Sequence, residues 1–279
     1  MAACSDCYER DCKGGDTRMK NYDSYFYETI SSESSSSADV IVPLVLKYIH
    51  PKSVVDVGCG LGVWLSVFKN HGIEDIFGID GDWINKNDLL IPDNCFMSFD
   101  LNKPLKLNKQ FDLVVSLEVA EHLPKENVDI FINSLTKLGN TILFSAAIPF
   151  QTGFNHVNEQ WPEFWVEKFT CQGYRVIDCL RKQIWKNDLV AKYYAQNILL
   201  FVKLSEIDTN EILAEEYKNT NVNILSLVHP KYYTKYYKAY NIALEEIRTI
   251  KKNHKIYFSI VNSILVPVNK AIKRILKIK

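Results

Sequence analysis

A stretch of fifteen residues, Val54 to Phe68 (VVDVGCGLGVWLSVF), most constrains what this chain can fold into. It begins with β-branched apolar residues, which are typical of a strand buried on both faces. Three glycines follow, and after them the apolar residues recur at helical spacing. Glycines permit unusual dihedrals and a close approach of a ligand to the backbone, and the following helix offers free N–H groups. The stretch therefore predicts a parallel α/β fold with a nucleotide-like cofactor at the end of this strand.

The glycine spacing distinguishes between cofactor classes. Gly58, Gly60 and Gly62 follow a G-x-G-x-G pattern, and Asp56 precedes the first glycine by two residues. The run Asp-Val-Gly-Cys-Gly-Leu-Gly resembles the first motif of class I S-adenosylmethionine (SAM) dependent methyltransferases. The resemblance implies that Asp56 and the three glycines bind SAM. Taken alone, the run also fits a glycine turn in an ordinary α/β protein.

The next two predicted strands each end in a carboxylate. Asp80 comes eighteen residues after Gly62, close to the spacing at which doubly wound folds place an acid on ribose hydroxyls. The resemblance implies that Asp80 holds the ribose and that Trp83 covers the adenine. It further implies that Asp100 and Leu101 lie beside the adenine amino group. A lone acid at a strand end, such as Asp100, fits a solvated or capping role equally well.

Strands and helices are predicted to alternate between residues 51 and 203. Seven strands in this arrangement resemble the Rossmann-like methyltransferase sheet, with strand order 3-2-1-4-5-7-6, six strands parallel and the seventh antiparallel. Ligands then collect at the carboxyl edge, where the order reverses around the first and fourth strands. The predicted strands are 53–57, 75–80, 96–100, 111–117, 141–148, 174–181 and 195–203.

A second motif follows the fourth strand. Glu118, Glu121 and His122 are spaced i, i+3 and i+4, so on a helix they would share one face. His156 lies in the loop after the neighbouring fifth strand, and we expect all four side chains to converge. The E-x-x-E-H pattern with a later His resembles the metal site of small-RNA terminal 2′-O-methyltransferases, and its first part resembles ubiquinone-pathway O-methyltransferases. In metal-free relatives the first Glu faces SAM.

Two ways of activating an acceptor hydroxyl stay open. His156 or His122, grouped with Glu121, could remove the proton as a general base near neutral pH. Alternatively, Glu118, Glu121, His122 and His156 could hold a divalent cation that lowers the hydroxyl pKa. Mixed oxygen and nitrogen ligands leave magnesium, manganese and zinc as candidates.

The loop from Pro149 to Pro162 predicts the acceptor class. The loop carries side chains that can bind a polyol: Asn155, His156, Asn158, Glu159 and Gln160. Trp161, and Trp165 just after the loop, offer flat apolar faces, although the core is at least as expected a place for them. Residues 22–203 resemble methyltransferases of glycan and lipopolysaccharide biosynthesis. The resemblance implies O-methylation of a sugar hydroxyl, on a glycan or a nucleotide-linked precursor. The alternatives are a metal-dependent RNA 2′-O-methyltransferase and a non-catalytic SAM-binding scaffold.

The formal net charge of zero conceals a division along the chain. Between His229 and Lys279, twelve Lys and Arg stand against two Glu, so residues 1–228 carry ten excess negative charges. An acidic catalytic region disfavours nucleic acid as a partner. The basic tail, in which apolar residues recur at helical spacing, predicts contact with a membrane surface or another subunit. A solvated helix docked on its own domain is the simpler alternative.

The domain organisation follows from these patterns. We expect a flexible segment over residues 1–21, a methyltransferase domain with an N-terminal lid over 22–203, and a basic helical extension over 204–279. Ser36 or Ser37 is placed to cap a helix from Ala38 to Tyr48. Seven irregularly spaced cysteines predict a reducing, cytoplasmic location, peripheral to a membrane if the tail binds one.

Overall fold

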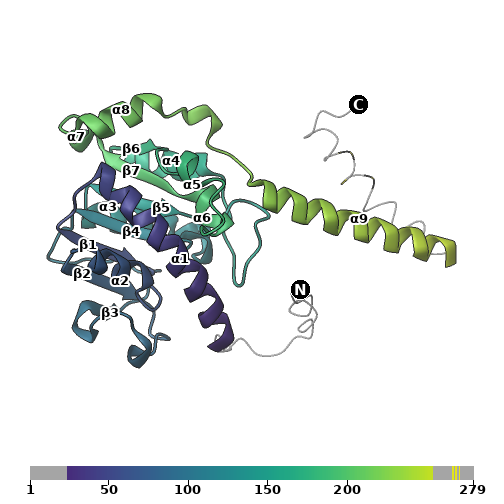
Figure 1. Cartoon of the computed structure of the whole chain (residues 1–279), viewed down its shortest axis with the longest axis horizontal. Coiled ribbons are helices and arrows are strands. Elements are labelled where there is room, and N and C mark those ends of the chain that lie inside the picture. Colours follow the sequence, from purple (N-terminus) through teal and green to yellow (C-terminus); the bar gives the residue numbers. More distant parts are fainter. Residues whose placement is uncertain (1–23, 254–265, 267, 269, 271–279) are drawn as a thin grey trace.

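A computed structural model describes residues 24–253, 266, 268 and 270. A seven-stranded sheet lies between two layers of helices (Figure 1), with the order β3-β2-β1-β4-β5-β7-β6 that the sequence predicts. β7 is antiparallel to β5 and β6, and the other pairs are parallel. The strands are β1 Ser53–Val57, β2 Asp75–Asp80, β3 Phe96–Ser98, β4 Leu113–Leu117, β5 Thr141–Ser145, β6 Tyr174–Ile177 and β7 Leu199–Lys203.

Both faces of the sheet are covered, which explains the unbroken apolar runs in its central strands. Along β1, Val54 belongs to one hydrophobic core and Val55 to the other, as alternation in a strand requires. The first core includes α1 (Ser24–Tyr48) and α2 (Val63–Asn70), and the second includes α3 (Val128–Leu138) and α4 (Pro162–Cys171). Two short helices, α5 (Arg181–Ile184) and α6 (Lys192–Asn197), contribute to the first core.

The helix predicted to begin at Ala38 begins at Ser24 instead, and α1 runs through the whole serine cluster. The Ser36 and Ser37 hydroxyls do not cap a helix start; both donate to the backbone carbonyl of Glu33, one turn earlier. Ser34 hydrogen bonds to the Tyr194 hydroxyl over 3.1 Å. Contacts with distant residues therefore override the low helix propensity of serine.

Five predicted strands extend too far, and those predicted over 111–117 and 141–148 are confined to Leu113–Leu117 and Thr141–Ser145. β6 ends at Ile177, because the chain turns so that the buried Arg181 guanidinium can bind Asp178 and the carbonyls of Gln196 and Leu225. The predicted seventh strand from Ala195 begins as helix α6, and β7 starts only at Leu199. The strand predicted over 96–100 ends at Ser98, so Asp100 lies in the following turn.

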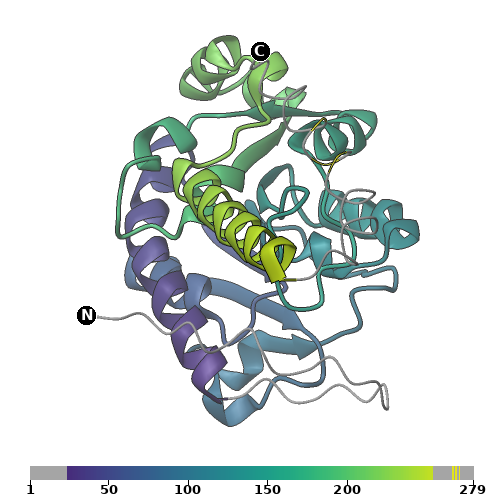
Figure 2. The same cartoon turned by 90° about the vertical axis from the view of Figure 1, so that its right-hand side faces the viewer.

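The helical extension predicted over 204–279 is interrupted near its start. α7 (Leu204–Ile207) and α8 (Glu211–Asn219) are separated at Asn210, whose side chain caps α8. The helical spacing of apolar residues in the basic tail is confirmed over α9 (Pro230–Asn253), which projects away from the sheet (Figures 1 and 2). The 3₁₀ turns are η1 Lys86–Asp88, η2 Asp93–Cys95, η3 Ala120–His122, η4 Lys125–Asn127 and η5 Val222–Ile224.

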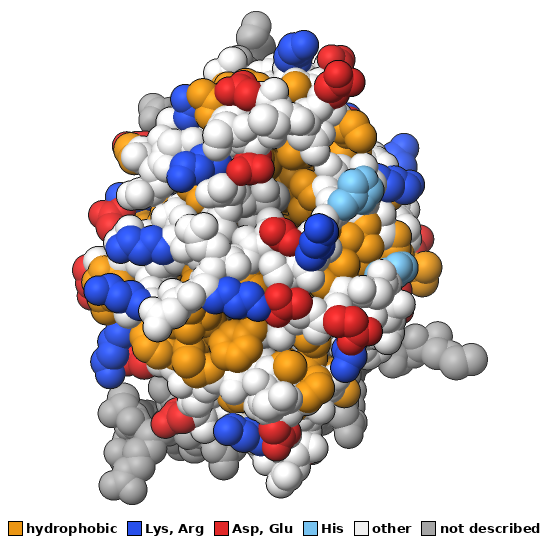
Figure 3. Space-filling view, turned by 90° about the vertical axis from the view of Figure 1, so that its left-hand side faces the viewer, with side chains coloured by type: hydrophobic (Ala, Val, Ile, Leu, Met, Phe, Trp, Pro, Cys, Tyr) orange, Lys and Arg blue, Asp and Glu red, His pale blue; other side chains and the backbone are white. Residues whose placement is uncertain are grey.

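The surface on the side opposite α9 mixes basic, acidic and hydrophobic side chains, with no large area of one charge (Figure 3). The predicted flexible segment 1–21 and nearly all of the predicted tail segment 256–279 lie outside the described residues. Within the described part of the chain, no helix is both long and apolar enough to span a membrane.

Candidate active site

The glycine turn connects β1 to α2 with three residues in the left-handed region: Gly58, Gly60 and Gly62 have φ of 88°, 53° and 81°. A Cβ on Gly58 would lie 2.3 Å from a Val119 methyl carbon, so packing also requires glycine there. A Cβ on Gly60 would meet no atom within 4 Å. Gly60 therefore borders open space at the carboxyl end of β1, where a ligand can approach the backbone.

Asp80 and Asp56 are buried beside this turn. Asp80 accepts hydrogen bonds from the Gly60 N–H at 2.7 Å and the Gly81 N–H at 2.6 Å, and these partly offset the rise in its pKa caused by burial. Asp56 Oδ2 is buried without a hydrogen-bond partner in the described part of the chain. Burial, followed by repulsion from Asp80, raises the pKa of Asp56 well above its usual range. An unpartnered carboxylate oxygen beside the glycine turn fits the ammonium group of SAM.

The three residues expected around the adenine differ in their exposure to solvent. The Trp83 ring is half exposed and packs over Gly81, where a Cβ would lie 2.1 Å from it. Leu101 is buried after β3. Asp100 is exposed and accepts hydrogen bonds from the backbone N–H of Asn102 at 3.0 Å and from its side-chain amide at 3.1 Å. These two bonds hold the turn and lower the pKa of Asp100. The capping role is thus observed for Asp100, and its contact with adenine stays a prediction.

Glu118 does not share a helix face with Glu121 and His122, contrary to the expected i, i+3, i+4 arrangement. It has φ of 55°, and only a 3₁₀ turn, η3, follows it. Its carboxylate accepts hydrogen bonds from Gln151 Nε2 at 2.9 Å and Asn197 Nδ2 at 3.0 Å. Burial raises the pKa of Glu118, although these bonds oppose the rise.

The other three predicted side chains do converge. One ligand atom from each of Glu121, His122 and His156 lies within 4.8 Å of the other two. The imidazoles are perpendicular, with ring centroids 4.9 Å apart. Burial, and then His156, lowers the pKa of His122 to about 4, so this ring is neutral at pH 7.

Glu121 is completely buried, and its Oε2 has no hydrogen-bond partner among the described residues. Burial, and then the proximity of Glu118, raises the pKa of Glu121 well above its usual range. An unpartnered carboxylate oxygen beside two imidazoles fits a divalent cation, because it joins hard oxygen with nitrogen donors. Glu118, with its oxygens bound to amides, lies outside this group.

We call residues 149–161 the catalytic loop. Glu159 organises it by accepting from the Phe150 N–H at 2.7 Å, the Thr152 N–H at 2.8 Å and His156 Nδ1 at 2.8 Å. With Nδ1 donating to this carboxylate, His156 Nε2 is left as the proton acceptor. A Cβ on Gly153 would lie 2.2 Å from Nε2, so glycine allows the ring to occupy this position.

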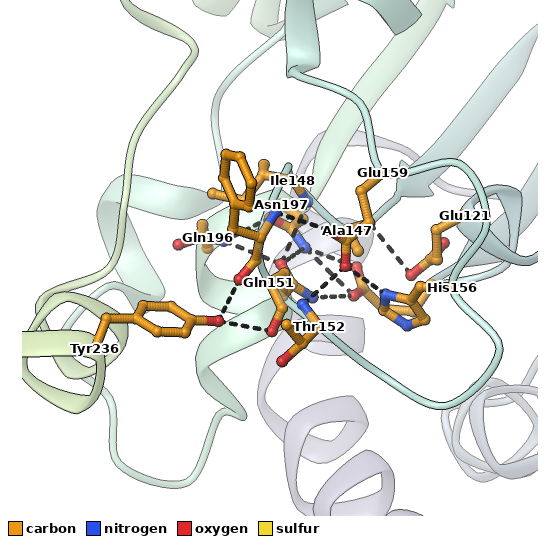
Figure 4. A network of polar contacts seen from close by, with 12 residues as sticks. Glu121, Ala147, Ile148, Gln151, Thr152, His156, Glu159, Gln196, Asn197 and Tyr236 are labelled. Atoms are coloured by element: carbon orange, nitrogen blue, oxygen red, sulfur yellow. Dashed lines mark hydrogen bonds and ion pairs between the residues drawn. The ribbon is translucent and has the colours of Figure 1, made fainter. Parts of the chain in front are cut away.

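A network of side-chain amides joins the catalytic loop to α6 (Figure 4). Gln151 Oε1 accepts from Gln196 Nε2 at 3.1 Å and from Asn197 Nδ2 at 2.9 Å. The Tyr236 hydroxyl of α9 donates to the carbonyls of Phe150 and Gln151.

The sequence interpretation missed Gln151, Asn197 and Tyr236, because only folding brings these three residues together. The sequence interpretation also assigned Glu159 to acceptor binding. The spacing of three residues between His156 and Glu159 could have indicated that Glu159 orients the His156 ring.

The side chains of the predicted polyol-binding loop divide between the core and the surface. Trp165 is buried against Phe144, with ring centroids 5.3 Å apart, so it belongs to the core. Asn158 is buried, and its Oδ1 accepts from Gln160 Nε2. Trp161 keeps 40% of its surface exposed, and three other apolar side chains of the loop are also exposed: Phe150, Phe154 and Val157. The loop thus exposes apolar side chains together with the polar Thr152 and Asn155, and its binding of a polyol stays a prediction.

Comparisons with known proteins agree with this architecture. A family model described as "Methyltransferase domain" matches residues 34–189. The chain is 31% identical to the mitochondrial ubiquinone biosynthesis O-methyltransferase of Dictyostelium discoideum, over 33% of this chain and 34% of that protein. It therefore spans about a third of the length of this curated relative.

Solved structures with a similar fold have low sequence identity. The methyltransferase domain of bacterial CtHen1 is 21% identical with a TM-score of 0.46, covering 61% of this chain and 98% of that chain. The amino pentose methyltransferase CalS10 of Micromonospora echinaspora is 10% identical with a TM-score of 0.49, covering 67% and 100%. Likenesses at this level carry no information on the acceptor.

Proposed function

The chain belongs to the methyltransferase domain family and is a SAM-dependent methyltransferase, and we propose that it methylates a hydroxyl oxygen of a sugar-containing acceptor. The observation that carries the proposal is the His156 ring, oriented by Glu159 next to His122 and Glu121 at the carboxyl edge of the sheet. The O-methyltransferase activity named for the Dictyostelium relative supports an oxygen acceptor.

The proposed cofactor contacts lie along the ends of β1 and β2. Asp80 would accept from the ribose hydroxyls, Asp56 would face the ammonium group, and Trp83 would cover the adenine. Gly60 leaves the backbone free for close approach. SAM supplies a methyl group on a sulfonium, which is already a strong electrophile. The contribution of the protein is therefore to align the acceptor oxygen behind the methyl carbon and to remove its proton.

The proton would go to His156 Nε2. The Glu159 carboxylate fixes the tautomer with Nδ1 protonated and stabilises the imidazolium that forms. As the new C–O bond forms, the C–S bond breaks and its electron pair stays on sulfur. The exposed faces of Trp161 and Phe154 can stack on the apolar face of a sugar ring.

Glu121, His122 and His156 also support a second route to the same product. They would hold a divalent cation, magnesium, manganese or zinc, whose chemistry there is to lower the pKa of the acceptor hydroxyl. His156 would then serve as a ligand. This route matches the metal-dependent RNA 2′-O-methyltransferase alternative, which the acidic charge of residues 1–228 disfavours.

Transfer of labelled methyl from SAM to a set of nucleotide sugars tests the proposal. His156→Ala should abolish turnover while SAM affinity, measured by calorimetry, stays unchanged. Gly153→Ala should also reduce turnover, because the added Cβ displaces the imidazole. His71→Ala, an exposed residue at the end of α2, is the matched control. Loss of SAM binding in His156→Ala would indicate that His156 has a structural role and does not act on the acceptor.

Chelation separates the two routes. Turnover that survives EDTA, without Mn²⁺ binding to the purified protein, assigns His156 as the base. Turnover that is lost with EDTA and restored by Mn²⁺ assigns the three side chains as ligands, and Glu121→Gln should then weaken Mn²⁺ binding. Transfer to an RNA 3′ end, but to none of the sugars, would reject the proposed acceptor class.

A further inference from the structure

Lys192 on α6 lies beside the first turn of α9, where its ammonium faces the Tyr232 ring and is repelled by Lys231 and Lys235 of α9. Lys192 is half buried, and its ammonium lies 5.0 Å from the centroid of the Tyr232 ring. Within the described ranges, no carboxylate pairs with this ammonium at ion-pair distance. An aromatic contact compensates the charge of a partly buried cation only incompletely.

The carboxylates nearby are already engaged. Asp188 pairs with Lys231 at 2.6 Å, and Glu33 accepts a hydrogen bond from the Tyr193 hydroxyl at 3.1 Å. Burial, followed by repulsion from Lys235, lowers the pKa of Lys192, and the attraction of Glu33 only partly opposes this. The local charge therefore favours an added anion, which would relieve the repulsion between the ammonium groups.

Contiguous contacts place this lysine group beside the acceptor site. The ring of Tyr232 stacks on that of Tyr236, with centroids 6.3 Å apart. The Tyr236 hydroxyl binds the catalytic loop at the Gln151 carbonyl over 2.9 Å. The side chain of Gln151 binds Glu118 at the end of β4. Figure 4 shows Tyr236 reaching the catalytic loop from the α9 side, with His156 on the other side of it.

We propose that Lys192, Lys231 and Lys235 bind the phosphate groups of the acceptor, which is a sugar carrying a phosphate or diphosphate ester. The inference rests on the proposed function and adds a second point of recognition to it. Ammonium groups bind phosphate oxygens as compact charges. Held there at one end, the acceptor would reach across the catalytic loop and present its sugar hydroxyl towards His156.

Titration of the full-length protein with inorganic pyrophosphate at constant ionic strength tests this without any methyl transfer. Wild type should bind pyrophosphate, and Lys192→Gln should weaken binding roughly tenfold or more, as for loss of a charge-assisted contact. Lys192→Arg should retain binding, because it keeps the charge. Lys69→Gln, an exposed lysine in the last turn of α2, should behave as wild type. Unchanged SAM affinity in each variant verifies that the fold is intact.

Three outcomes would overturn the inference. They are absence of pyrophosphate binding by wild type, equal binding by Lys192→Gln, and an equal loss in Lys69→Gln. A lipid headgroup offers the same phosphate chemistry, so sedimentation with phosphatidylglycerol vesicles forms a second arm. Vesicle binding that depends on Lys192, without pyrophosphate binding, would assign the lysines to a membrane and reject the acceptor. Failure of the proposed function would appear separately, as an absence of methyl transfer to sugars.

Discussion

The Tyr236 hydroxyl donates a hydrogen bond to the Gln151 backbone carbonyl over 2.9 Å, across 85 positions of sequence. This bond fastens α9, which begins 27 residues after the end of β7, to the catalytic loop. Gln151 in turn binds Glu118 and Asn197 through its side chain. The C-terminal extension thus takes part in holding the loop that carries His156.

Tyr236→Phe should lower kcat roughly fivefold, because a neutral hydrogen bond contributes about 1 kcal/mol and its loss loosens the catalytic loop. SAM affinity should stay unchanged, since the proposed cofactor contacts lie at β1 and β2. Tyr233→Phe removes a hydroxyl from an exposed side chain of the same helix and should have no effect. Equal losses in both variants, measured by steady-state kinetics, would contradict a positioning role for Tyr236.

Asp80→Asn should weaken SAM binding by about 1.5 to 3 kcal/mol, because it removes charged hydrogen bonds to the ribose. Asp75→Asn is the matched control: it lies at the start of the same strand, where it pairs with Lys109 on the surface. Calorimetric titration with SAM measures both. A Kd for Asp80→Asn within a factor of two of wild type would remove Asp80 from the proposed cofactor site.

Asp56→Asn should stabilise the protein without cofactor at neutral pH. Burial raises the pKa of Asp56 in the folded state, so the folded state holds this proton more tightly than the unfolded state. Ionisation therefore costs stability, and the loss accumulates as pH rises from the usual aspartate range through the raised pKa. Asparagine cannot ionise, and the variant should lack this decline.

Urea unfolding of wild type and Asp56→Asn between pH 4 and pH 8 measures the difference. The variant should gain most at the upper end, and it should bind SAM more weakly if Asp56 faces the ammonium group. A stability difference that is constant with pH would indicate that Asp56 does not titrate in this range. Greater stability combined with weaker binding is the expected signature of a strained functional residue.

The sequence was sufficient for the parts of the fold that rest on local patterns. The apolar run before Gly58 and the helical spacing after Gly62 predicted β1 and α2, and the resemblance supplied the sheet order that the structure confirms. Periodicity failed at α1, because the serines gain their partners from α6. It failed again at Ala195, where a short helix precedes β7.

The candidate site could be predicted only in part, because folding alone brings some of its residues together. His122, Glu121 and His156 were recognisable because they follow neighbouring strands, and they do converge. The predicted position of Glu118 was wrong, because its left-handed backbone directs the chain into a 3₁₀ turn. Gln151 and Asn197 carry no local signal, since a buried amide and a surface amide look identical in sequence. The predicted membrane or subunit contact of the tail stays a prediction.

The serine-rich helix α1 has a consequence for synthesis of the chain. The Ser37 hydroxyl accepts from the Ala191 N–H 154 positions later, and Ser34 pairs with Tyr194 160 positions later. Until α6 has left the ribosome, this face of α1 lacks the groups that cover its hydroxyls, and serine gives a helix little intrinsic support. A nascent chain that stops before residue 190 therefore cannot complete the N-terminal helix as it stands in the finished protein. Emergence of α6, rather than of the strand that precedes the glycine turn, is therefore the event that lets α1 form its final contacts.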